Sequence, residues 1–442
     1  MPNLDCGTLP LEIVQEIIKW NADYTNAVRA SSLVSRLWRE ASLKFLFRDI
    51  AFRDKRQLDG WDRWLKGSPQ IVQAVRRVQF FPSCLAPQDT LPHLPSMTVM
   101  PGVTDLEWCF YSPTRMFPES DLVQFLHNFP SLRSVTLASE FADLGSLKTF
   151  LGACGPNVAT LELQEGLTCL SKHGGTKKAA QKGSNCSKSP NALDLPKLEH
   201  LVIGSERSFF DWVYKDLFTP SVFRQLHSLT IESEAFTLPT LNQIFEACSP
   251  TLLQLTIDPT NKTLSNDGIS LRPLPEMFSP IQALTKLTIG LFYFGGTWEP
   301  ENVLDWACAF LEVFQAKNLA TLEFLCYAAE PMDVTEVLED YDWGPLVTLV
   351  RKNYKNVQEL VLWITMEMDF GRRARASLEQ QARASGLSKF VGEGKRLNVK
   401  WTVENPSWGS YSDDGFSEDD GEDTNDNSKE EDISDGSPEE GY

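Results

Sequence analysis

The sequence predicts an α/β protein in which a short helical module precedes a solenoid of strand–helix units, and three observations support this. An apolar triplet at relative positions 1, 4 and 6 recurs ten times between Val75 and Leu362. The segments between triplets place apolar residues at helical spacing, as in Leu144–Cys154. Several of these segments end in a break such as Gly155-Pro156 just ahead of the next triplet. Units of this kind bury their apolar faces only by stacking on one another, which gives a solenoid.

The chain begins with two apolar runs at helical spacing. In the first run Pro10 suits the first turn of a helix, because its missing N–H would have had no partner there. A polar break at residues 21–26 leads to the second run. About 40 residues bury too little surface to be stable alone, so several apolar side chains are expected to need a partner chain or the following domain. The apolar residues of the two runs are Ile13, Ile17, Ile18 and Trp20, then Leu33, Leu37, Trp38, Ala41 and Phe45.

These two runs resemble an F-box motif, the helical module by which substrate receptors bind the Skp-type adaptor of cullin–RING ubiquitin ligases. The family usually has Cys where Ser35 stands. The resemblance covers about a tenth of the chain and implies the adaptor, and through it a cullin, as partners. The alternative is an ordinary helical hairpin that caps the next domain. The resemblance rests on Leu9-Pro10-x-Glu12-Ile13, Ile17-Ile18, Leu33-Val34-Ser35-Arg36-x-Trp38-Arg39 and Leu46-Phe47. The adaptor-binding residues that it implies are Leu9, Pro10, Ile13, Ile17, Ile18, Val34 and Trp38.

Residues 53–74 are expected to link the module, at residues 1–52, to the solenoid, at residues 75–403. They contain Leu58, Trp61, Trp64 and Leu65 before Gly67-Ser68-Pro69, which breaks any helix. The sequence therefore predicts one short packed helix and a turn in this linker.

The ten triplets start 26 to 40 residues apart, a spacing that suits one strand and one helix in each unit. They resemble the long, irregular form of leucine-rich repeats, which implies parallel strands on a concave inner face. The family's asparagine three positions past the last leucine is absent. The alternative is another α/β fold with coincidental leucine spacing. The triplets are Val75/Val78/Phe80, Val103/Leu106/Trp108, Leu132/Val135/Leu137, Val158/Leu161/Leu163, Leu198/Leu201/Ile203, Leu226/Leu229/Ile231, Leu252/Leu255/Ile257, Leu284/Leu287/Ile289, Leu319/Leu322/Phe324 and Val357/Leu360/Leu362, and a last strand is expected at Leu397, Val399 and Trp401.

Two segments lie outside the repeats. Residues 167–191 contain five lysines, no acid and few apolar residues, so a disordered insertion is expected there. Residues 404–442 are expected to form a disordered acidic tail, because 14 acids stand against Lys429 from Asn405 onward. The total charge is −19, so the tail's −13 leaves only −6 for the preceding 404 residues. The tail is expected either to be phosphorylated at Ser417, Ser428 and Ser437 or only to keep the protein soluble.

No pattern in the sequence indicates catalysis. The five histidines, at positions 93, 127, 173, 200 and 227, lack the spacing of a metal site, and no phosphate-binding loop or nucleophile elbow occurs. We therefore expect no enzymatic activity and no cofactor or metal. No basic patch predicts nucleic-acid binding, and no apolar run or signal peptide predicts a membrane or secretion. The nine cysteines form no C-x-x-C pair, as expected of a reduced protein of the cytoplasm or nucleus.

Strand alternation predicts the residues of the inner face, because positions 3, 5 and 7 of each unit point away from the buried positions 4 and 6. These positions hold seven acids against Arg77 and Lys286, so a bound client protein is expected to present a basic or hydroxyl-rich segment.

The expected function is the substrate-recognition subunit of a Skp–cullin–F-box ligase. A leucine-rich scaffold without a ligase role is the alternative, and an unrecognised hydrolase using Cys and His is a third hypothesis. The client-binding candidates are Arg77, Phe81, Glu107, Glu162, Glu232, Asp258, Glu323 and Trp363.

Overall fold

The protein was analysed as a computed structural model, in which Met1–Glu404 and Asn405–Tyr442 are separate units. The predicted tail and residues 170–191 of the predicted insertion lie outside the described residues. The structure describes residues 9–22, 24–53, 55–81, 98–110, 119–141, 143–164, 167–169, 192–204, 213–232, 238–258, 278, 280–293, 301–328, 334–335, 338–339, 342–366, 371–392 and 394–403.

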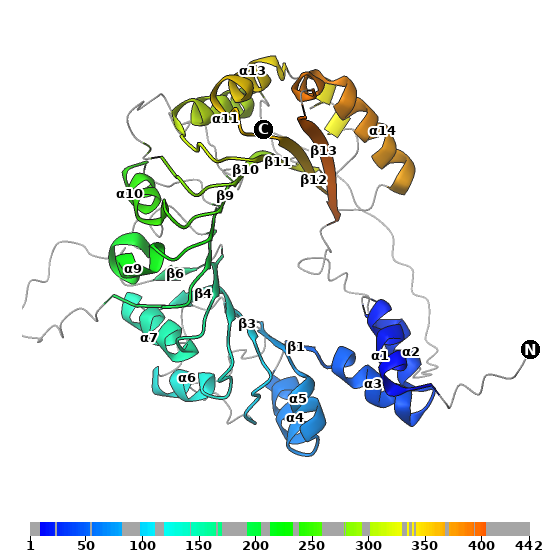
Figure 1. The fold of residues 1–442 in the computed structure, drawn as a ribbon. Helices are drawn as coiled ribbons and strands as arrows, with labels where there is room; N and C mark the ends of the chain where they lie inside the picture. The colour runs from blue at the N-terminus through cyan, green and yellow to red at the C-terminus, as the bar shows by residue number, and fades with distance from the viewer. Residues whose placement is uncertain are drawn as a thin grey trace, which may run out of the picture. The chain divides into compact units, whose positions relative to one another are not determined.

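One sheet dominates the fold of Met1–Glu404, and in the described residues twelve strands follow one another in chain order. Every neighbouring pair is parallel, and β6 (Thr168–Cys169) pairs with β4 off this path. The sheet is curved, with helices along its outer side (Figure 1). The strands are β1 Asp49–Phe52, β2 Arg77–Phe80, β3 Asp105–Phe110, β4 Ser134–Phe141, β5 Thr160–Leu163, β7 His200–Ile203, β8 Ser228–Ile231, β9 Gln254–Ile257, β10 Lys286–Tyr293, β11 Thr321–Ala328, β12 Glu359–Met366 and β13 Arg396–Val403.

Helix α7 (Leu144–Cys154), between β4 and β5, carries its own start and stop signals. In α7 the Asp143 carboxylate accepts the Ser146 N–H at 2.8 Å, which caps the first turn. Gly155, with φ 92°, ends the helix in a conformation that glycine adopts without strain. The helices from residue 55 onward are α4 Lys55–Lys66, α5 Pro69–Ala74, α6 Glu119–Leu126, α7 Leu144–Cys154, the π-helical turn η4 Val213–Leu217, α9 Pro220–Phe223, α10 Leu238–Cys248, α11 Glu301–Val313, α13 Gly344–Asn353, α14 Gly371–Ala384 and the 3-10 turn η5 Gly386–Phe390.

The strand register aligns the predicted triplets one on the next. Leu161, Leu201, Leu229 and Leu255 are direct neighbours across four strands, and each is at most 1% exposed. Positions 4 and 6 of the units face the helices and form one continuous core. The prediction of an α/β protein built on repeated parallel strands is therefore confirmed, and β13 is the predicted final strand.

Three boundaries differ from those expected. The first strand, β1, lies in the segment assigned to the helical module, and its Ile50 and Phe52 belong to the core of the sheet. Residues 53–74 hold two helices, α4 and α5, rather than one. Leu167 is 1% exposed and the next two residues form β6, so the chain is ordered to Cys169 and the predicted insertion at 167 begins too early.

The front of the chain forms a separate small core. We call the segment Leu9–Leu46, with its helices α1 (Leu11–Trp20), α2 (Thr25–Ser32) and α3 (Arg36–Leu46), the helical module. Its buried apolar residues are Val14, Ile18, Val28 and Ala41, and this cluster is distinct from the core of the sheet. Contacts between α3 and α5 join the module to the first repeats.

Candidate functional site

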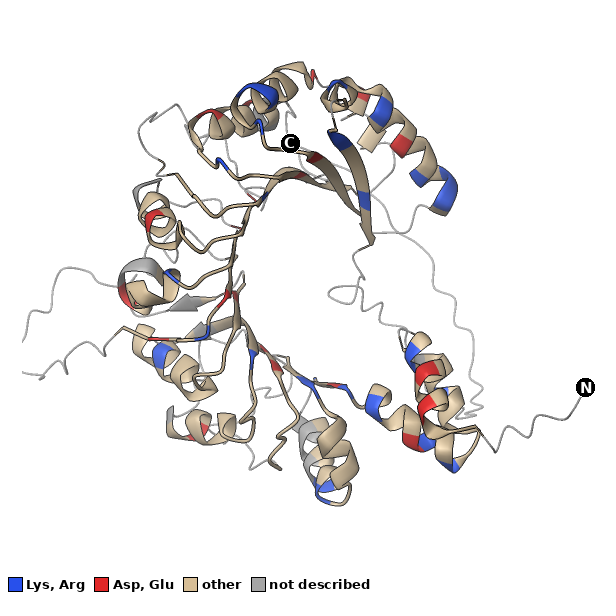
Figure 2. Ribbon diagram, in the orientation of Figure 1, with Lys and Arg blue, Asp and Glu red and all other residues tan. Residues whose placement is uncertain are grey.

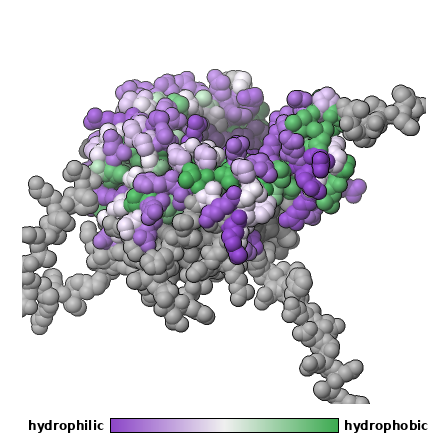
Figure 3. All heavy atoms as spheres, turned by 90° about the horizontal axis from the view of Figure 1, so that it is seen from below, coloured by the Kyte–Doolittle hydropathy of each residue, from purple (hydrophilic) through white to green (hydrophobic). Residues whose placement is uncertain are grey.

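The helical module exposes large apolar side chains. Helix α1 buries Val14 and Ile18, whereas Ile13 and Trp20 on its other side are 48% and 81% exposed, with Ile17 half-buried between them. Three residues around α2 add to this surface: Tyr24, Leu33 and Val34 are 64% to 78% exposed. Figure 3 shows hydrophobic residues gathered over the module. We call Ile13, Ile17, Trp20, Tyr24, Leu33 and Val34 the module patch.

The predicted adaptor-binding residues are divided between this surface and the module's own core. Pro10, Ile13 and Val34 are exposed, and Leu9, Ile17 and Trp38 are half-buried. Ile18 is 1% exposed and packs inside the module, so it offers no surface to a partner. Sequence reasoning did not select Trp20, Tyr24 or Leu33 for binding. Trp20 had a usable signal, because it follows Ile13 and Ile17 at the i, i+4, i+7 spacing of one helix face.

The inner face of the sheet, opposite the helices, holds the predicted client-binding residues but exposes them unequally. Arg77 is exposed, and Glu162, Glu232, Trp363 and Phe81 are half-buried. The same face contains buried acids: Glu107, Asp258 and Glu323 are 1% to 6% exposed. A buried carboxylate is costly unless it is paired, so its partners decide its role.

At the N-terminal end of the sheet Glu107 is satisfied within the chain. Its Oε2 accepts hydrogen bonds from Arg77 Nη2 at 2.7 Å and Gln79 Nε2 at 2.6 Å, and Cys109 Sγ lies 3.6 Å from Oε1. Phe81 packs against the core of the sheet. These residues tie β2 to β3, and Arg77 is the most exposed side chain of the group.

The middle of the inner face carries three neighbouring acids, Glu162, Glu232 and Asp258, which we call the acidic group. Burial, followed by the charges of Asp258 and Glu162, raises the pKa of Glu232 to about 7. Glu162 Oε2 accepts from Thr136 Oγ1 at 3.1 Å, and Asp258 Oδ2 accepts from Tyr327 Oη at 3.2 Å. Repulsion within this group favours a cationic ligand over an anionic one.

Glycine at position 290 makes room for the Asp258 side chain. A Cβ at Gly290 would overlap the Asp258 carboxylate and lie 3.0 Å from its Cα. The bare backbone at this position therefore lets Asp258 lie across β10 toward Tyr327 on β11.

The C-terminal end of the inner face holds two lysines around Glu323. Lys286 Nζ lies 2.8 Å from Glu323 Oε2, and Lys400 Nζ lies 2.9 Å from Oε1. Thr288 Oγ1 donates to Oε2 at 3.2 Å. Burial alone would raise the pKa of Glu323, but the bonds from the two lysines outweigh it and hold that pKa below the usual value. We call Lys286 and Lys400 the lysine pair.

Trp363 lies beside the lysine pair. Its ring centroid is 5.8 Å from Lys286 Nζ and 6.0 Å from Lys400 Nζ, and its Nε1–H donates to Thr402 Oγ1 at 2.7 Å. The ring is therefore fixed by contacts from β10 and β13, and two intramolecular cations lie over it. A client that uses Trp363 as an anchor must approach through this arrangement.

The described residues contain no group of three or more His, Cys, Asp and Glu placed to hold a metal ion. Their cysteines are poor nucleophiles: burial, aided by Glu107, raises the pKa of Cys109 to about 12, and burial raises that of Cys248 to about 12. No helix in this part of the chain is long and apolar enough to span a membrane.

The fold and its surfaces define an α/β protein with a solenoid-like parallel sheet, an apolar surface on a helical module and a charged inner face. No protein-family model and no curated protein sequence matches the chain.

Proposed function

We propose that this chain is a non-catalytic substrate receptor of a Skp–cullin–F-box ubiquitin ligase, in which the helical module binds the adaptor and the inner face binds the client. The observation that carries the adaptor half is the module patch. Ten large hydrophobic residues are well exposed in the described chain, and five of them lie between Ile13 and Val34. Apolar surface concentrated in this way is typical of a protein interface.

The small core of the module explains why its surface would need a partner. Four fully buried apolar side chains support three helices, and the apolar stripe of α1 faces away from them. An adaptor helix packed on this stripe would bury Ile13, Ile17 and Trp20 together. Tryptophan and tyrosine in such a position usually contribute most to affinity, so Trp20 and Tyr24 are the expected anchors.

The client half of the proposal is supported by the charge of the inner face. The acidic group suits a basic segment, and strand-borne residues give a rigid surface on which to position it. The receptor would act by proximity: holding a client near the ubiquitin-loaded enzyme raises the effective concentration of its lysines. Such a receptor would function in the cytoplasm or nucleus.

The adaptor half is tested by co-purification with a recombinant Skp-type adaptor. Replacing Ile13 and Trp20 with Asp should weaken binding at least about 100-fold, because charges would enter an apolar interface. The matched control is Leu253→Asp, an exposed leucine beside β9, which should bind as the wild type does. A folded wild-type chain that fails to bind the adaptor would refute the receptor role and favour the scaffold. Equal binding by the Ile13/Trp20 variant would refute the assigned surface.

A further inference from the structure

The inner face changes its charge preference along the sheet. Between β5 and β9 it carries the acidic group, whereas the lysine pair and Glu323 together leave one net positive charge between β10 and β13. Figure 2 shows basic residues on β13. A client chosen only for positive charge would therefore be repelled at the C-terminal end of the face.

Glu323 fixes the position of the lysine pair. The carboxylate is 1% exposed and lies on β11, and the two lysines reach it from β10 on one side and from β13 on the other. Lys400 must cross β12 to do so, because its own register neighbour there is Trp363. A desolvated carboxylate holds each ammonium strongly, since the interaction is little screened by water. Surface lysines normally lose side-chain entropy on binding a ligand, whereas these two are already ordered.

The lysine pair is also open to solvent. The side chains of Lys286 and Lys400 are 30% and 45% exposed. An ammonium has three N–H donors, and Glu323 receives one from each lysine. Glu323 does not use the remaining donors, and the two ammonium groups lie 5.8 Å and 6.0 Å from the Trp363 ring centroid. This geometry offers several donors to one oxyanion, with an aromatic surface beside it.

We propose that the lysine pair and Trp363 form a subsite for an oxyanion on an extended client segment, a carboxylate or a phosphate. This inference rests on the client half of the proposed function and is independent of adaptor binding. It also assigns the client a bipolar character, with basic residues over the acidic group and an oxyanion over the lysine pair. Trp363 would then contact the residue beside the oxyanion.

The test uses the purified full chain and three immobilised peptide libraries that are degenerate around a fixed central phosphoserine, glutamate or serine. At physiological salt the wild type should retain the phosphoserine or the glutamate library about tenfold better than the serine library. Preference for phosphoserine alone identifies a phosphate, and preference for both identifies a general oxyanion. Equal retention of the three libraries would overturn the proposal.

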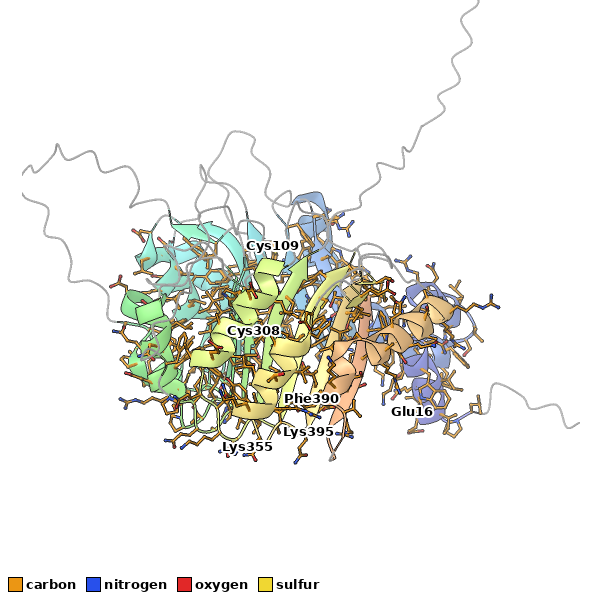
Figure 4. The ribbon with its side chains drawn as sticks, turned by 90° about the horizontal axis from the view of Figure 1, so that it is seen from above. Glu16, Cys109, Cys308, Lys355, Phe390 and Lys395 are labelled. Atoms are coloured by element: carbon orange, nitrogen blue, oxygen red, sulfur yellow. The ribbon has the colours of Figure 1, made fainter. Side chains whose placement is uncertain are left out.

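Variants separate the subsite from general electrostatics. Lys400→Gln should abolish the preference, and Lys400→Arg should keep it, because a guanidinium still reaches Glu323 and an oxyanion. The matched control is Lys395→Gln, which removes a lysine lying 5.2 Å from the Phe390 ring without touching Glu323 (Figure 4). A loss in Lys395→Gln equal to that in Lys400→Gln would overturn the assignment. Unfolding curves of each variant confirm that the fold is retained.

Discussion

The helical module and the parallel sheet differ in how completely each buries its apolar side chains. In the sheet the strands from β2 to β12 each pair with two neighbours, the apolar triplets are buried under helices, and even the acid Glu323 has partners from two other strands. In the module, four buried apolar side chains hold three helices while Trp20 and Leu33 face solvent. The sheet buries its apolar side chains within its own chain, whereas the module leaves large apolar side chains exposed, and we propose that a partner covers them. Substitutions should therefore affect stability in the sheet and binding in the module.

The largest effect is expected where the sheet satisfies a buried charge. Replacing both Lys286 and Lys400 with Met would leave the Glu323 carboxylate buried without its cations, and should lower the free energy of unfolding at pH 7 by about 3–4 kcal/mol. Burial would then raise the pKa of Glu323, so the deficit should shrink toward pH 4 as the carboxyl becomes protonated. Urea unfolding at the two pH values measures both effects.

Two further variants sharpen this result. Adding Glu323→Leu to the double variant removes the unpaired charge and should recover most of the lost stability. Arg396→Met breaks an exposed pair with Glu359, 3.9 Å apart, and should change stability by less than about 0.5 kcal/mol. If the double variant were as stable as Arg396→Met, Glu323 would not depend on the lysine pair.

A smaller change in stability, a gain instead of a loss, is expected from a substitution in the acidic group. The pKa of Glu232 is raised from its ordinary 4.5 to about 7, so the carboxyl favours folding below pH 4.5 and loses that contribution as the pH rises through 7. Glu232→Gln should therefore stabilise the protein at pH 8 by about 1–2 kcal/mol, after allowance for solvent screening, and leave it unchanged at pH 4. Thermal unfolding measures the difference. The exposed Glu199→Gln is the control, and equal gains in both variants would contradict this explanation.

The sequence predicted the sheet well because its signal is repeated. Each apolar triplet aligns with the next, so an error in one unit is corrected by the others, and a strand is present at each of the ten triplets. Strand β1 was missed although Phe47, Ile50 and Phe52 match positions 1, 4 and 6 of the triplet, because Leu46-Phe47 was assigned to the helical module. The inner-face residues were found by alternation, but their pairing was not: Lys400 and Glu323 are 77 residues apart, and only the register brings them together.

The apolar periodicity of the module predicted a helix at α1 but did not determine which side of that helix faces the module's core. Ile17 and Ile18 are adjacent and equally apolar, yet Ile18 is buried and Ile17 lies at the edge of the exposed stripe. The orientation is set by contacts with α3 and by the core that α1 shares with Val28 and Ala41. These contacts depend on the turns at 21–22 and 33–34, whose residues do not follow the helical periodicity.

The smallest change in stability is expected in the module patch, and it distinguishes the two sides of α1. Trp20→Ala and Ile13→Ala should each change the free energy of unfolding by less than about 0.5 kcal/mol, because neither side chain loses much buried contact. Ile18 lies on the buried side of α1. Ile18→Ala should therefore lower the free energy of unfolding by about 2–3 kcal/mol, because it leaves a cavity beside Val14 and Val28. Urea unfolding of the three variants provides the measurement. If Trp20→Ala destabilised the protein as much as Ile18→Ala does, Trp20 would be packed within the chain, and the module would need no partner to cover it.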